Sequence, residues 1–290
     1  MKSITRIIDG DQYPERFGLF VFFDIHLGSI ATDEKLLLND IARVENNKDF
    51  WVDGGDSLEC INRTDKRHKE ELVAPWAWGK TDIIQAQIER YKKYFSPISK
   101  QCLCKSTGNH EESVLSKYER DVNYELVSWM KNQINDDSIF INGGLRTIIN
   151  LCFRWEHDSK NKPHQTYNLK IFVGHGYGGG RLEGAPGLRL GRILKEYNVD
   201  LAYIGHSHQM GYIHQNQFDT DFRKNKIIER DRYAYHVPSY RKTLQNELAT
   251  EDKVITDYTD IKLFPPSIAG GVRTIIDFRN KTIIDPMRNF

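Results

Sequence analysis

The stretch Phe17–Phe23 reads FGLFVFF and runs directly into Asp24-Ile25-His26. Nearly every residue in it is apolar, which is the pattern of a β-strand buried on both faces. An acid and a histidine that follow such a strand lie at its carboxyl end, where ligands gather in open α/β sheets. Asp24 and His26 are therefore the first candidates for a functional site.

The same arrangement recurs at four later strand ends. FWV runs into Asp53-Gly54-Gly55-Asp56, CLCKST into Gly108-Asn109-His110-Glu111, LKIFV into Gly174-His175-Gly176 and LAYI into Gly205-His206-Ser207-His208. Each piece alone has an ordinary explanation, such as a capped turn or a helix N-cap. All five together, each at the end of an apolar strand, are not expected by coincidence. In D-x-H and H-x-H, an extended segment would point both side chains to one face.

We count seven of these side chains as metal ligands: Asp24, His26, Asp56, Asn109, His175, His206 and His208. One tetrahedral site needs about four ligands, so the set predicts two ions, about 3.5–4 Å apart if a carboxylate bridges them. Mixed imidazole, carboxylate and carboxamide ligation favours Mn, Fe, Zn or Ni over Mg or Ca, which prefer oxygen. Mn is our first choice of metal.

The rest of the chain alternates short apolar runs with amphipathic segments. We expect helices over 32–47, 81–95, 113–133 and 188–197, and strands over 50–52, 101–106, 138–142, 146–153, 169–173, 201–204, 233–237 and 272–278. Residues 61–80 fit no period and are predicted to be an inserted loop that acts as a lid. Residues 1–290 are expected to form a single α/β domain, with 211–290 as a β-rich C-terminal cap integrated with the core. The competing interpretation separates 211–290 from the core.

The composition excludes several classes of protein. Hydrophobic residues make up 39% of the chain, which is enough for a core and excludes wholesale disorder. The 41 Lys and Arg against 40 Asp and Glu leave a net charge of +1, so a general nucleic-acid or membrane-surface binder is not indicated, although a local basic groove stays open. No stretch approaches the roughly 20 apolar residues of a membrane span. A membrane partner is therefore not expected. Four cysteines without a disulfide framework favour a cytoplasmic protein. The oligomeric state is left open.

The five motifs together resemble the signature of the calcineurin-like metallophosphoesterase family, which runs D-x-H, G-D-x-x-[DE], G-N-H-[DE], G-H and G-H-x-H. They span about two-thirds of the chain. The resemblance implies an α/β (α+β) fold, a two-layered β-sandwich flanked by helices, with two metals at the strand ends. It implies that the first metal is held by Asp24, His26, Asp56 and His208, and that the second is bridged by Asp56 and completed by Asn109, His175 and His206. His110 would be the catalytic imidazole, while Glu59, where Asp or Asn is commoner, lies outside the implied ligand set.

The resemblance also implies hydrolysis of a phosphoester by a hydroxide that two metal ions activate, with His110 assisting the phosphoryl group or the leaving oxygen. The tryptophan-bearing insertion and the basic stretch over 223–242 favour a phosphodiesterase or nuclease acting on nucleotides or nucleic acid. Arg181, Trp76 and Trp78 are the candidate substrate-binding residues. Packing of the tryptophans and a solvated basic face are the alternatives for these features. The alternative functions are a phosphomonoesterase acting on a small molecule or a phosphoprotein, and a non-catalytic scaffold that retains the fold.

Overall fold

Two six-stranded sheets form the centre of the structure, a computed structural model that describes residues 1–290 except 136–140, 157–164, 177–184, 222–224, 243–267 and 285–290. Sheet A contains, in spatial order, β1 (Lys2–Asp9), β6 (Arg146–Trp155), β7 (Gln165–Gly174), β8 (Leu201–Ile204), β10 (Lys226–His236) and β9 (Gly211–Asp221). Sheet B contains β12 (Thr282–Ile284), β11 (Val272–Asp277), β2 (Arg16–Phe22), β3 (Phe50–Asp53), β4 (Cys102–Ser106) and β5 (Asn142–Gly144). The α-helices are α1 (Glu34–Asn47), α2 (Ile83–Phe95), α3 (Asn109–Tyr118), α4 (Val122–Ile134) and α5 (Ala185–Glu196).

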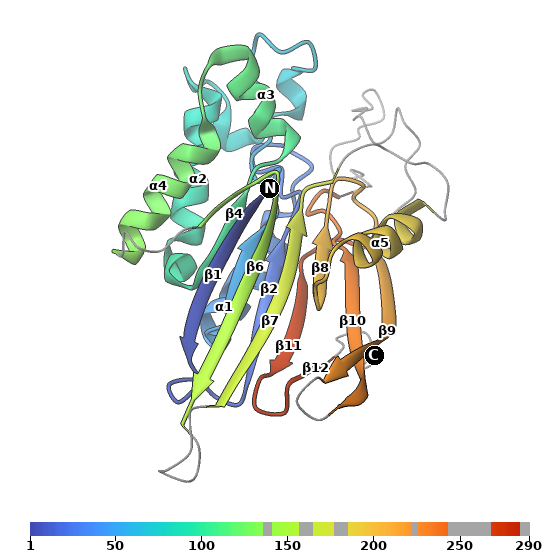
Figure 1. Ribbon diagram of the computed structural model, residues 1–290. Coiled ribbons are helices and arrows are strands. Elements are labelled where there is room, and N and C mark those ends of the chain that lie inside the picture. Colours follow the sequence, from blue (N-terminus) through green and yellow to red (C-terminus); the bar gives the residue numbers. More distant parts are fainter. Residues whose placement is uncertain (136–140, 157–164, 177–184, 222–224, 243–267, 285–290) are drawn as a thin grey trace.

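The stretch FGLFVFF is buried on both faces because β2 lies inside a layered structure. Leu19, Val21 and Phe23 pack between the two sheets, whereas Phe20 and Phe22 pack against helices. Full burial of each such side chain stabilises the folded state by about 1.5–3 kcal/mol. Helices α1, α2 and α4 cover the outer face of sheet B, and α5 covers sheet A beside β8 and β10 (Figure 1). The predicted β-sandwich flanked by helices is confirmed.

Strand direction brings the candidate ligands to one edge. Strands β2, β3 and β4 run parallel as neighbours in sheet B, and β7 and β8 run parallel in sheet A. Their carboxyl ends are tied together by backbone hydrogen bonds, in which Asp24 N–H donates to Gly55 O at 3.1 Å and Gly205 N–H donates to His175 O at 3.2 Å. The two sheets are joined there as well, because His206 N–H donates to Asp24 Oδ2 at 2.7 Å.

The C-terminal portion supplies strands to both sheets. Strands β9 and β10 extend sheet A next to β8, and β11 pairs antiparallel with β2 in sheet B. Strands from 211–290 therefore belong to both sheets, as is expected if this region is integrated with the core. The assignment of residues 1–290 to a single domain stays a prediction.

The structure differs from the predicted elements at the helix over 113–133 and at the N-terminus. The helix predicted over 113–133 is wrong: Glu119 adopts a left-handed φ of 55° that ends α3, and the Asp121 side chain then caps α4. Strand β1 was not predicted, because only Ile4 and Ile8 of its apolar residues point into the core while Ile7 is exposed. Most of the strand predicted over 138–142 lies outside the described residues. Among the described helices, none has the length and apolar character needed to cross a membrane.

Candidate metal centre

All seven predicted ligand side chains come together at the shared edge of the two sheets. They lie after β2 (Asp24, His26), after β3 (Asp56), at the start of α3 (Asn109), after β7 (His175) and after β8 (His206, His208). The side chains form two clusters that share a boundary at Asp56.

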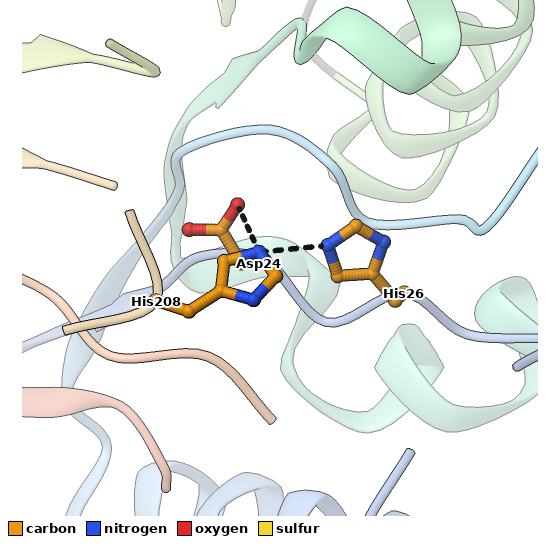
Figure 2. A group of neighbouring side chains, drawn as sticks. All are labelled: Asp24, His26 and His208. Carbon is orange, nitrogen blue, oxygen red and sulfur yellow. Dashed lines mark hydrogen bonds and ion pairs between the residues drawn. The ribbon is translucent and has the colours of Figure 1, made fainter. Parts of the chain in front are cut away.

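The first cluster contains Asp24, His26 and His208. Figure 2 shows the three side chains pointing toward one another, with His26 Nε2 at 3.2 Å and Asp24 Oδ1 at 3.6 Å from His208 Nε2. Burial lowers the pKa of His26 to about 4 and the pKa of His208 well below its usual value, so both imidazoles are neutral near pH 7. Asp24 Oδ1 is buried and accepts no hydrogen bond from the described residues. Neutral imidazoles and an unsatisfied carboxylate oxygen fit a divalent cation.

The second cluster contains Asp56, His175 and His206, with Asn109 between the two imidazoles. Asn109 Oδ1 lies 3.0 Å from His175 Nε2 and 2.8 Å from His206 Nδ1. Asp56 Oδ2 lies 3.2 Å from His175 Nε2 and 4.0 Å from His26 Nε2 in the first cluster. The Asp56 carboxylate therefore lies between the clusters, where the family resemblance implies a bridging ligand.

Asp56 and His175 carry opposite charges in this arrangement. Burial would raise the pKa of Asp56, but the charges of His175 and His110 hold it well below its usual value. Burial would lower the pKa of His175, but Asp56 and Asp24 raise it to about 10. The buried carboxylates thus require positive charge at this position. The imidazolium supplies it here, and a divalent cation would supply it in the loaded site.

Five of the seven candidate ligands adopt the left-handed backbone conformation: Asp24 (φ 48°), His26 (φ 52°), Asp56 (φ 51°), His206 (φ 69°) and His208 (φ 56°). The expectation of extended D-x-H and H-x-H segments is therefore wrong. The side chains converge because the chain turns at each ligand. Such conformations cost of order 1–3 kcal/mol each and concentrate at functional sites, where the surrounding structure holds them.

Glu111, the last residue of the G-N-H-E motif, holds the loop that carries Asp56. Its buried carboxylate accepts hydrogen bonds of 2.8–3.2 Å from the backbone N–H groups of Asp56, Ser57, Leu58 and Gly108. The first turn of α3 adds another contact, since His110 N–H donates to Asp56 Oδ1 at 2.8 Å. The sequence predicted no role for Glu111 in the site.

A buried ion pair beneath the same loop was missed from the sequence. Asp53 and Lys105 are paired across β3 and β4, and neither is exposed to solvent. Lys105 Nζ lies 3.4 Å from Asp53 Oδ1 and donates to Ser57 Oγ at 2.7 Å. Ser57 Oγ in turn donates to Asp53, which also accepts from Tyr91 OH at 2.7 Å. The available signal was one acid and one lysine inside the otherwise apolar segments FWVD and CLCKS.

His110 is not one of the predicted ligands, but it lies beside the first cluster and forms a third group of possible metal-binding side chains with His26 and Glu59. Its Nδ1 lies 2.5 Å from the backbone carbonyl oxygen of Glu59, so Nδ1–H donates there and Nε2 is left for other chemistry. Its ring packs edge to face against His26, with centroids 4.7 Å apart. Burial would lower the pKa of His110, but Asp56 and Glu59 raise it.

The structure gives no contact between the metal centre and the candidate substrate residues that it describes, Trp76 and Trp78. Trp76 donates from Nε1 to Glu34 at 2.6 Å and has the Arg90 guanidinium 4.5 Å from its ring centroid, which favours the packing alternative. Trp78 is half exposed, and its Nε1 donates to Val73 O. Arg181 lies outside the described residues.

The basic stretch over 223–242 does not form a continuous basic face in its described part. Arg230 donates to Asp200 at 2.7 Å, and Arg232 donates to Val199 O at 2.7 Å, so both contribute to the fold. Arg241 instead reaches the candidate centre, where its Nη1 lies 3.4 Å from Glu59 Oε2.

Comparison with known proteins gives the family. A family model described as Calcineurin-like phosphoesterase matches residues 21–210. A comparison with curated proteins found no match. Similar solved structures include a conserved uncharacterized protein, a predicted phosphoesterase, from Streptococcus pneumoniae TIGR4, with 11% identity, 93% of this chain and 94% of that chain covered, and a TM-score of 0.33. Another is a metallophosphoesterase from Sphaerobacter thermophilus, with 13% identity, 78% of each chain covered, and a TM-score of 0.34.

The region matched by the family model begins inside β2 and ends just after the last candidate ligand. It covers about two-thirds of the chain and includes all five motifs. The matched family, the sandwich fold and the clusters of metal-binding side chains agree with one another. The chain belongs to the calcineurin-like phosphoesterase family and is a metal-dependent phosphoester hydrolase.

Proposed function

We propose that the protein is a phosphodiesterase acting on nucleotide-type substrates, with nucleic acid as the extended form of the same substrate class. Two divalent ions, with Mn as first choice, would be held by the seven residues of the two clusters, and His110 would be the catalytic residue. The four free cysteines support a cytoplasmic location.

The observation that carries the choice of a diester is that two separate segments, the 61–80 insertion and the segment after β10, lie against the loops of the centre. Arg241 approaches Glu59 from the segment after β10. Arg67 belongs to the 61–80 insertion, where its guanidinium donates to Asp65 at 2.9 and 3.0 Å. A phosphodiester carries an organic group on each side of the scissile phosphate and so extends from the metals in two directions. Two separate segments beside the centre suit such a substrate, because each would contact one of its organic groups.

The 61–80 insertion lies against the loop that follows His26. Ile30 N–H donates to Leu72 O, and Ala74 N–H donates to Gly28 O, both at 2.9 Å. This attachment supports our proposal that the insertion is a lid over the centre. The half-exposed ring of Trp78 would then be available to stack on a base.

The chain's own groups fit the chemistry of phosphoester hydrolysis. Bound divalent cations supply charge neutralisation at the phosphoryl oxygens and a lowered pKa for water. Glu111 and the first turn of α3 hold the Asp56 carboxylate in place. The contact between His110 Nδ1 and Glu59 O orients the His110 ring and leaves Nε2 to carry the proton that a leaving oxygen needs.

Asp56→Asn is expected to lose at least one of the two metal ions. An amide offers one neutral oxygen donor where a carboxylate offers two oxygens that share a negative charge, and Asp56 lies between the clusters. Metal analysis of the purified protein measures the stoichiometry. Asp231→Asn, which alters an exposed carboxylate on β10, is the matched control. An Asp56→Asn protein that still binds two ions would contradict the bridging role.

In the presence of Mn²⁺, we expect the wild-type protein to hydrolyse a generic nitrophenyl diester with a kcat/KM more than about tenfold above that for the matching monoester, a difference of about 1.4 kcal/mol. A chelator should abolish turnover, because it removes the divalent cations that the buried carboxylates would hold. Added Mn²⁺ should restore turnover.

The outcomes of this assay separate the three functions. A preference for the monoester would replace our proposal with a phosphomonoesterase. Bound metal without turnover of either ester would indicate a scaffold. Once diester hydrolysis is established, a dinucleotide and a single-stranded oligonucleotide compared at equal phosphate concentration would show whether the substrate is a nucleotide or a nucleic acid.

A further inference from the structure

Three side chains with little solvent exposure form a chain of contacts that ends on a proposed metal ligand. Arg241 Nη1 lies 3.4 Å from Glu59 Oε2, and the same oxygen lies 2.9 Å from His26 Nδ1. We infer that Glu59 and Arg241 are positioning residues, in which Glu59 fixes the ring and tautomer of His26 and Arg241 fixes Glu59. The inference rests on the metal-binding role of His26 in the proposed function.

The two nitrogens of His26 face different surroundings. Nε2 faces Asp24 and His208 in the first cluster, as Figure 2 shows. Nδ1 is buried and makes no hydrogen bond of standard geometry with the described residues, and the polar atom beside it is Glu59 Oε2, at 2.9 Å. A carboxylate beside Nδ1 favours the tautomer with the proton on Nδ1, so the lone pair is on Nε2 where a metal would bind. Such partners orient a metal-binding imidazole and raise its basicity.

Glu59 also contacts the proposed catalytic residue. Its side chain reaches His26, while its backbone carbonyl accepts from His110 Nδ1. The two imidazole rings therefore share one support and pack against each other. A shorter acid at this position would draw the carboxylate back by one methylene, away from His26 Nδ1. This gives a physical reason for Glu where Asp or Asn is commoner.

Arg241 is held against the loop of the first cluster, although it is 182 residues from Glu59 in sequence. Tyr240 N–H and Ser239 Oγ–H both donate to Asp24 O, at 3.1 and 2.7 Å, and Lys242 N–H donates to Ala31 O at 2.8 Å. The backbone that carries the guanidinium is thus hydrogen-bonded to the ligand loop. Its charge compensates the nearly buried Glu59 carboxylate, which would otherwise be costly to desolvate.

The test compares Glu59→Ala, Arg241→Met and the double variant. Calorimetry with Mn²⁺ should show metal binding weakened by about 10–100-fold for Glu59→Ala and by about tenfold for Arg241→Met. The double variant should bind no more weakly than Glu59→Ala, because Arg241 acts through Glu59. Lys242→Met removes the neighbouring cation, which lies near Asp33, and should bind metal like the wild type.

A second readout needs neither metal nor turnover. Long-range ¹⁵N–¹H NMR correlations in the metal-free protein should show His26 protonated at Nδ1 in the wild type and a mixture of tautomers in Glu59→Ala. If Glu59→Ala or Arg241→Met fails to fold, Glu59→Gln and Arg241→Lys keep the side-chain volume and are measured in the same way. We expect intermediate losses of metal affinity from these two variants.

Three results would overturn the inference. One is an unchanged His26 tautomer in Glu59→Ala. Another is an Arg241→Met protein with normal metal affinity and a raised KM, which would make Arg241 a substrate-binding residue. The third is additive losses in the double variant, which would mean that the two residues act independently. A wild-type protein that binds metal but hydrolyses no diester would defeat the proposed function and leave the inference intact.

Discussion

His110→Gln should bind two metal ions like the wild-type protein and hydrolyse phosphodiesters with an alkoxide leaving group about 10²–10⁴-fold more slowly, the usual contribution of a positioned proton donor. The backbone N–H of His110 keeps its bond to Asp56 in the variant, so the bridging carboxylate stays in place. What is lost is the imidazole, whose Nδ1 is engaged by Glu59 O and whose Nε2 is left for the substrate. Turnover should therefore fall while metal content is preserved.

Leaving groups of different basicity sharpen this measurement. If His110 protonates the leaving oxygen, the defect in kcat should be large for an alkoxide leaving group and small for nitrophenolate, which leaves without a proton. His214→Gln is the matched control, because that histidine pairs with Asp231 on the β9–β10 hairpin and belongs to neither cluster. A His110→Gln protein with normal metal content and full activity toward both esters would exclude a catalytic role.

The ligand set could be predicted from the sequence because each ligand follows a strand directly. The apolar run FGLFVFF predicts that both faces of β2 are buried. The parallel order of β2, β3 and β4 brings the residues after these strands to one edge. These features depend on local sequence and on general rules of sheet topology. The same reasoning gave the wrong backbone conformation at Asp24 and His26, because a left-handed turn at a non-glycine residue is imposed by surrounding contacts and has no local signature.

The supporting residues could not be predicted because their partners are distant in sequence. Arg241 belongs to a basic stretch whose ordinary interpretation is a solvated face, and only the return of the chain after β10 brings it to Glu59. The register of β3 against β4 pairs Asp53 with Lys105, and neither strand alone indicates that the other carries the opposite charge. Sequence patterns thus identify the metal-binding residues better than they identify the residues that support them.

Lys105→Met should lower the free energy of unfolding by about 3–5 kcal/mol, the cost of leaving one partner of a buried ion pair without the other. Burial would lower the pKa of Lys105, but Asp53 and Glu111 raise it, so the lysine is charged in the folded protein. Methionine fills a similar volume and removes the charge, which leaves the buried Asp53 carboxylate without its cation. Lys93→Met, an exposed position on α2, should change stability by less than about 0.5 kcal/mol.

Denaturant unfolding of the metal-free protein measures this cost directly, and the double variant Asp53→Leu/Lys105→Met separates charge from packing. The double variant should be more stable than Lys105→Met, because no uncompensated charge is left. It should remain below the wild type, because Ser57 and Tyr91 lose the acceptor that Asp53 provides. Since Ser57 adjoins Asp56, Lys105→Met should also weaken metal binding. If the double variant recovers stability but still binds metal weakly, the ion pair positions the bridging ligand. A loss below about 1 kcal/mol for Lys105→Met would mean that water or a shifted side chain replaces the lysine, and that the ion pair does not hold this loop.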